Sequence, residues 1–385
     1  MTRREALIGF GLFGTALTIP AVMCCGPSTT LALRPWSGPP PAEHDVRMRA
    51  LSYAVLAPNA HNTQPWSLAL HEKDEIVLYV DRTRLLPATD PPFRQAHVSQ
   101  GTFLELLVIA LAEFGHGAEV TLFPEGEYSE MDDRPVARVR VLPEPARRDP
   151  LFAQIALRRS NKRPYDPDAK LTSAQIASIE KSLGADAGAS IKVLDAPKSR
   201  ETIARICTDA MAVEVEDRAR NVETAKWFRF SSAELEEKRD GFGLEHNGKS
   251  GFTRWFAETF VLDRESSANP EGAFATGAID MARDQAASAP AFGVLATPDN
   301  TRRAQVLAGR AYARIALTVQ ALGLAMHPMS QALEEYSDMT KVKARLEREV
   351  ALAPGGTVQM FFRLGHAEAS PHTPRRSVRD MVRSS

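Results

Sequence analysis

Cysteine is scarce in this 385-residue chain, which contains only Cys24, Cys25 and Cys207. Two of these lie near the N-terminus and the third stands alone, so the sequence offers neither a disulfide framework nor a cysteine-rich zinc site. The nine histidines form no HExxH pair, and no GxSxG segment is present for a serine hydrolase. We therefore expect no metal centre and no side-chain nucleophile.

The chain also has no excess of basic or acidic residues. The chain has 47 Lys and Arg against 48 Asp and Glu, a formal net charge of −1. No broad basic field is available to gather nucleic acid, so we expect no nucleic-acid partner. Hydrophobic residues make up 44% and charged residues 25%, as in soluble globular proteins. The length predicts two units, or one unit with insertions.

The N-terminal segment 1–26 has the pattern of a twin-arginine export signal. Arg3 and Arg4 precede a moderately apolar run from Ala6 to Met23. The expected location is the periplasm or the outer face of the cytoplasmic membrane. Cleavage, lipidation at Cys24 or Cys25, and retention as a membrane anchor all stay open. Residues 27–44 then form a Pro-rich linker that cannot hold a helix.

The remaining chain reads as two series of mixed helices and strands. The first half spans 45–146 and the second 147–385, with a charged, helical, lid-like insertion at about 200–288. In each half a long apolar helix runs into a glycine and then a strand, a weak sign of internal duplication. The predicted helices cover 46–56, 98–114, 151–158, 173–183 and 302–322, and the strands cover 75–80, 118–123, 136–142, 191–194, 291–297 and 358–364.

The most specific local motif runs from Ala57 to Trp66 and contains Asn59, Asn62 and Gln64. A helix ends at Pro58, and three amides then follow close together. Amides carry donors and acceptors, which suits the edge of a heterocycle such as the flavin pyrimidine. The alternative is a capped turn in which the asparagines bond their own backbone.

Two basic segments complete the pattern. Arg158-Arg159-Ser160-Asn161-Lys162-Arg163 concentrates cations beside a hydroxyl, a combination that can clamp a phosphate. The alternative is a solvated basic surface. Near the C-terminus, Thr373-Pro374-Arg375-Arg376-Ser377 is uninformative alone.

Together these motifs resemble the FMN-dependent nitroreductase family, which typically carries an Arg-x-Ser element, an Asn-x-Gln-Pro-Trp element, a Gly-Leu helix and a final basic pair. The resemblance implies an α+β sandwich with FMN at a dimer interface. In this chain the Asn-Thr-Gln-Pro-Trp element stands in the first half and the Arg-Arg-Ser element opens the second. Folded together as an intrachain pseudo-dimer, the halves would complete one flavin site without a second chain. This arrangement is similar to the Acg-like subfamily, some members of which have lost flavin turnover.

The resemblance assigns the cofactor contacts by motif. Arg158, Ser160 and Lys162 would face the phosphate, the ribityl chain and the flavin N1–O2 edge, and Arg375 and Arg376 would complete the phosphate clamp. The full predicted set is Pro58, Asn59, Asn62, Gln64, Arg158, Ser160, Lys162, Pro328, Met329, Ser330, Gln331, Arg375 and Arg376. No catalytic side chain is expected, because the flavin carries the redox chemistry.

The function expected from this resemblance is electron transfer from a reduced donor such as NAD(P)H to an aromatic nitro or quinone-like acceptor. An alternative is a protein that sequesters flavin or another heterocycle with little turnover. Two motifs would instead indicate nucleotide binding. Gly9–Gly14 matches the dinucleotide-binding pattern GxGxxG but lies in the predicted export signal. Gly243–Ser250 matches the P-loop pattern GxxxxGK[ST] but follows a charged helical pattern rather than an apolar strand. We therefore place P-loop nucleotide binding last.

Overall fold

The computed structural model describes residues 30–72, 74–184, 187–247 and 267–383. Its first half contains a four-stranded antiparallel sheet in the order β1-β2-β4-β3. Helix α1 (Val46–Ala54) precedes this sheet, and the long helix α2 (Arg94–Glu113) connects its second and third strands. The strands are β1 (Trp66–His71), β2 (Glu75–Val80), β3 (Gly117–Leu122) and β4 (Ala137–Leu142).

The second half repeats this plan. Its sheet has the order β5-β6-β8-β7, which is the same first-second-fourth-third arrangement. Helix α3 (Ser173–Glu180) precedes it, and α10 (Arg302–Ala321) connects its second and third strands. The strands are β5 (Ser190–Leu194), β6 (Ala291–Thr297), β7 (Ala325–Pro328) and β8 (Thr357–Gly365). The α+β class and the pairing of two like halves, both expected from the sequence, are confirmed.

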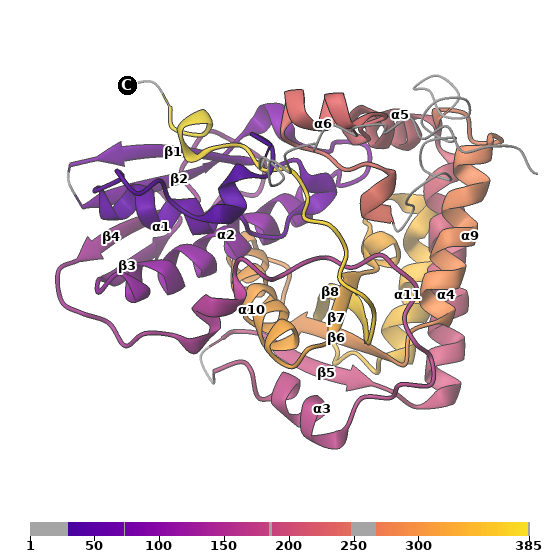
Figure 1. The fold of residues 1–385 in the computed structure, drawn as a ribbon. Helices are drawn as coiled ribbons and strands as arrows, with labels where there is room; N and C mark the ends of the chain where they lie inside the picture. The colour runs from indigo at the N-terminus through magenta and orange to yellow at the C-terminus, as the bar shows by residue number, and fades with distance from the viewer. Residues whose placement is uncertain (1–29, 73, 185–186, 248–266, 384–385) are drawn as a thin grey trace, which may run out of the picture.

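The halves meet where α2 crosses α10 (Figure 1). Each helix has 20 residues, and the crossing falls at the eighth residue of each, Gly101 and Gly309. An ideal Cβ on Gly101 would lie 1.9 Å from the carbonyl oxygen of Val306, and one on Gly309 would lie 2.0 Å from that of Val98. Only glycine permits backbones to approach this closely. The crossing is therefore nearly two-fold symmetric.

The insertion and the C-terminal segment enclose the space between the sheets (Figure 1). In Figure 1 the insertion helices stand along the right side and top, and the yellow C-terminal segment returns from β8 to the first half. There Val382 forms a parallel bridge with Leu68, and the Leu68 N–H donates to the Met381 carbonyl at 2.8 Å. Helix α11 (Thr340–Glu349) lies between β7 and β8, and the insertion supplies α4 (Pro197–Glu216), α5 (Arg218–Trp227), α6 (Ser232–Lys238) and α9 (Ala273–Ala287).

One sequence expectation fails. The predicted helix over 151–158 is only a 3-10 turn at Pro150–Gln154. Beyond it the Asn161 N–H donates to the Met326 carbonyl of β7. Within the segment predicted as a linker, Arg34–Ser37 forms a 3-10 turn and Ala32 is buried. Among the described residues, no helix is long and apolar enough to cross a membrane.

Candidate functional site

One cavity, of about 270 Å³, gathers most of the predicted site from both halves and the insertion. Because its walls come from segments more than 300 positions apart, it exists only after the halves pack together. All the predicted residues except Gln64 and Arg376 line it: Pro58, Asn59, Asn62, Arg158, Ser160, Lys162, Pro328, Met329, Ser330, Gln331 and Arg375.

The Asn-Thr-Gln-Pro-Trp motif forms an unusual loop at this cavity. His61, Asn62 and Gln64 have φ values of 48°, 53° and 53°, in the left-handed region that disfavours residues with a side chain. Trp66 is fully buried and donates its indole N–H to the Ser99 carbonyl of α2 at 2.9 Å. The strained loop is thereby anchored to the helix that carries the contact between the halves.

The amides of this loop are engaged within the protein. Asn62 donates to the carbonyls of Gly241 and Pro374 at 2.8 and 2.9 Å, and its oxygen accepts from Arg375. Asn59 accepts from the Gln64 N–H at 2.8 Å and donates to the Ala57 carbonyl. The side chains therefore hold the loop and the C-terminal segment in place, and direct contact with a heterocycle stays a prediction.

Gln64 and Arg376, two residues of the predicted set, do not line the cavity. Gln64 is fully buried, and its amide oxygen accepts from the Arg376 N–H at 2.8 Å. The Arg376 guanidinium donates to the Gln64 carbonyl at 2.7 Å. The pair joins the first half to the C-terminal segment, and contact of either residue with a cofactor stays a prediction.

One end of the cavity is strongly cationic. Arg158 and Arg375 are 4% and 2% exposed, and both donate to the Leu56 carbonyl. Among the described residues, neither forms an ion pair with a carboxylate, and the Nε–H of each is buried without an acceptor. Burial lowers the pKa of Arg158 to about 10, and it lowers that of Arg375 with a further contribution from Arg158. Buried cations without a carboxylate suit an anionic ligand.

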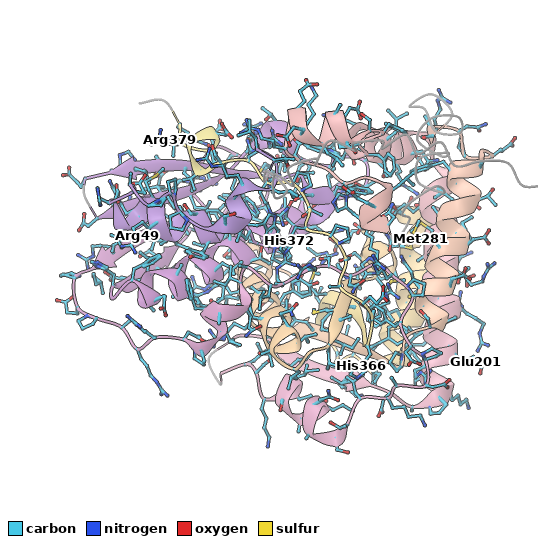
Figure 2. The ribbon with its side chains drawn as sticks, in the orientation of Figure 1. Arg49, Glu201, Met281, His366, His372 and Arg379 are labelled. Atoms are coloured by element: carbon cyan, nitrogen blue, oxygen red, sulfur yellow. The ribbon has the colours of Figure 1, made fainter. Side chains whose placement is uncertain are left out.

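Two aromatic residues beside this end were not predicted. Trp36 stacks on His372 with parallel rings whose centroids are 3.9 Å apart, and its indole N–H donates to the Thr373 carbonyl at 2.8 Å. Both line the cavity, and Figure 2 shows His372 near the middle of the molecule. Burial lowers the pKa of His372 to about 4, helped by the nearby arginines. The only sequence signal was a tryptophan in a Pro-rich segment, which gives no indication of its partner.

Another part of the lining comes from the insertion and is mainly apolar. Residues spaced three or four apart on α4 and α9 face the cavity, and Figure 2 shows Met281 of α9 among them. Glu214 is the one ionisable residue that α4 or α9 contributes. Burial raises its pKa to about 7 against the opposing effects of Arg220 and Lys162. The lining residues of the two helices are Met211, Glu214, Val215, Phe274, Ala278, Met281, Ala282 and Gln285.

Lys162 also lines the cavity. Its Nζ donates to the Asn247 side chain at 2.9 Å and lies 4.4 Å from the centroid of the Phe242 ring. Burial lowers its pKa to about 8, while Glu214 opposes the shift and Arg363 adds to it. A cation is thus held against an aromatic ring in the lining of the cavity.

The P-loop-like segment lies partly at this site. Helix α6 precedes it, so the described residues supply no strand to direct a phosphate loop. Its His246 and Asn247 line the cavity, whereas residues 248–250 lie outside the described residues. The twin-arginine and GxGxxG segments also lie outside them. Within the described part of the chain, no cluster of side chains could hold a metal ion.

Comparison with known proteins points to one group. The chain is 28% identical over 347 residues to "Putative NAD(P)H nitroreductase Rv3131" of Mycobacterium tuberculosis, covering 86% of this chain and 89% of that protein. It is 38% identical over 80 residues to "Putative NAD(P)H nitroreductase acg" of the same species, covering 21% and 24%. No model of a known family matches the chain.

Among solved structures, the FMN-dependent nitroreductase NfnB from Mycobacterium smegmatis, in complex with NADPH, is 15% identical with a TM-score of 0.38. The match covers 60% of this chain and 96% of that one. Similarity over most of the chain, 86% of it, is to the protein named "Putative NAD(P)H nitroreductase Rv3131".

Proposed function

We propose that this chain is an FMN-dependent oxidoreductase of the nitroreductase family, which takes electrons from NAD(P)H and passes them to an aromatic nitro or quinone-like acceptor. The observation that carries the proposal is the buried pair Arg158 and Arg375, which faces one cavity without a carboxylate partner among the described residues. The full-length similarity to a protein named as an NAD(P)H nitroreductase supports the choice of chemistry.

The donor set fits FMN. Two buried guanidinium groups and the exposed Ser160 hydroxyl offer charge-assisted and neutral hydrogen bonds to a phosphate. The segment Pro328–Gln331 and the strained loop from Pro58 to Asn62 offer walls for a flat ring. When bound, FMN would supply the hydride chemistry, while the protein orients it and Lys162 places a cation beside it.

The test uses purified protein titrated with FMN and with riboflavin, which lacks the phosphate. Arg158→Ala and Arg375→Ala should each weaken FMN binding by roughly 1.5–3 kcal/mol, a loss of about 10- to 100-fold. Riboflavin affinity should change far less. Arg163→Ala is the matched control, because Arg163 pairs with Glu368 at the surface, 3.0 Å away, and does not line the cavity. Equal losses for FMN and riboflavin would contradict the phosphate assignment.

The same preparation separates the enzyme from a sequestering protein. Anaerobic NADPH should bleach the flavin absorbance of the wild-type protein. A yellow protein that NADPH leaves unchanged, although dithionite bleaches it, would favour sequestration instead. Arg159→Ala should weaken FMN binding less than Arg158→Ala, because Arg159 lines the cavity but is only half-buried.

Export by the twin-arginine route belongs to the same proposal. It rests on Arg3 and Arg4 and the apolar run that follows them. Replacing both arginines by lysine should leave the protein in the cytoplasm, as measured by fractionation and immunoblotting. Unchanged export of that variant would exclude this route.

A further inference from the structure

The insertion brings a carboxyl group into a wall that is otherwise apolar. Glu214 lies in the last turn of α4, with Met211 one turn earlier and Val215 beside it, and all three line the cavity. Gln331, in the segment proposed to lie along the flavin ring, lines the same cavity as Glu214. The carboxyl group is therefore held next to the place where an acceptor would meet the cofactor.

The surroundings leave Glu214 without an ion-pair partner among the described residues. Arg220, at the start of α5, forms its ion pair with Asp338 instead, at 2.9 Å, and its guanidinium lies 3.5 Å from the centroid of the Tyr336 ring. Lys162 donates instead to Asn247. A buried carboxyl group without a paired cation favours its neutral, protonated form.

The other titratable groups around Glu214 either favour its protonated form as well or stay uncharged. Glu334 lines the cavity and accepts from the Gln95 amide, and its negative form would add repulsion. The Tyr336 hydroxyl, whose pKa is raised by burial and by these two carboxylates, stays protonated. The part of α9 that lines the cavity carries no charge. Glu214 is therefore the acid best placed to release a proton into the apolar compartment.

We propose that Glu214 is the proton donor to the acceptor, and that the acceptor is an uncharged aromatic molecule bound against the apolar faces of α4 and α9. This inference rests on the proposed function. A quinone acceptor gains a hydride from reduced FMN and a proton from Glu214, so that hydroquinone and oxidised FMN are formed. The Glu214 carboxylate then regains a proton from solvent. An anionic acceptor would be repelled whenever Glu214 is ionised.

The first test isolates the oxidative half-reaction. Dithionite-reduced protein is mixed in a stopped-flow instrument with menadione, which needs a proton, or with ferricenium, which accepts one electron and no proton. Glu214→Gln should slow oxidation by menadione about 10²-fold or more and leave oxidation by ferricenium unchanged. Glu214→Asp should recover part of the menadione rate. Glu216→Gln, an exposed site on the same helix, is the matched control and should behave as wild type.

The second test measures binding without turnover, through perturbation of the oxidised flavin spectrum. Affinity for para-nitrobenzoate, which is anionic throughout, should fall about tenfold between about pH 6 and pH 8 as Glu214 ionises. Affinity for neutral para-nitrobenzamide should stay constant. In Glu214→Gln most of the fall should disappear, because no carboxylate then forms at that position, and the remainder reflects the loss of charge on Lys162 toward pH 8.

The outcomes distinguish the two proposals. A wild-type protein that binds no flavin would overturn both the proposed function and the role of Glu214. If flavin binds and is reduced, equal menadione rates for wild type and Glu214→Gln would overturn only the proton-donor role. Equal slowing with menadione and ferricenium would also overturn it, because a structural defect affects both acceptors alike.

Discussion

The crossing of α2 and α10 gives the sharpest structural prediction. In Gly101→Ala the added methyl would lie 1.9 Å from the Val306 carbonyl oxygen and 2.8 Å from the Gly309 Cα, and both contacts are with backbone. No side chain can rotate away, so the helices must separate by more than about 1 Å. A gap of that size forfeits a quarter to a half of the dispersion energy of the contacts along it.

The expected free energy of unfolding follows from two opposing effects. Overpacking against backbone should cost about 3 kcal/mol or more, while replacing a helical glycine by alanine returns about 1 kcal/mol. The net loss for Gly101→Ala is therefore at least about 2 kcal/mol. Gly309→Ala should lose as much, because its methyl would lie 2.0 Å from the Val98 carbonyl oxygen.

Urea unfolding followed by circular dichroism measures the change. Gly277→Ala is the matched control, because this exposed glycine in α9 has nothing within 4 Å of its ideal Cβ and should gain up to about 1 kcal/mol. The double variant at Gly101 and Gly309 should lose less than the sum of the single variants, since the first methyl already separates the helices. Gly101→Ala that gains stability as Gly277→Ala does would refute the close crossing.

Three further predictions concern the site and the effect of pH. The monomeric chain should bind one FMN, and Asn62→Ala and Arg158→Ala should weaken that site non-additively, as measured by flavin titration and ultracentrifugation; two flavins per chain would contradict this. Trp36→Ala should weaken FMN binding by about 1 kcal/mol if the stacked pair forms a wall, and unchanged affinity would exclude that role. Burial lowers the pKa of His97 to about 3, so the unfolded chain takes up its proton first, and this residue should contribute a fall in stability of roughly 3 kcal/mol between pH 6.5 and pH 4. His97→Gln should reduce the fall measured by urea unfolding at the two pH values by that amount and leave the part due to His61 and His372, whose pKa burial also lowers to about 4; an unchanged dependence would refute the assignment.

Local sequence patterns predicted most of the helices and strands of this protein. The residues that one face of a helix or strand buries recur at short, regular intervals along the chain. The predicted strands at 75–80 and 291–297 match β2 and β6 to the residue, and the helix predicted over 302–322 differs from α10 by one residue. The helix predicted over 151–158 forms only short turns, in which the Ile155 and Leu157 N–H groups bond three residues back, and the Asn161 N–H then bonds to the distant Met326 carbonyl. A hydrogen bond to a residue so far along the chain cannot be predicted from a short stretch of sequence.

Motifs also determined which residues meet at the cavity, but not what each side chain does there. Asn62 and Arg375 are separated by 313 positions along the chain. Only the packed structure reveals that the Arg375 guanidinium donates a hydrogen bond to the Asn62 side-chain oxygen. Gln64 and Arg376 have the amide and guanidinium groups expected of cofactor contacts, but they bond to each other. Buried polar groups in a folded protein form hydrogen bonds with the partners that packing places beside them. Trp36 and Glu214 stood in segments predicted to be a linker and an insertion. Their place at the site is decided by tertiary packing, because long-range contacts leave no periodic signal in the sequence.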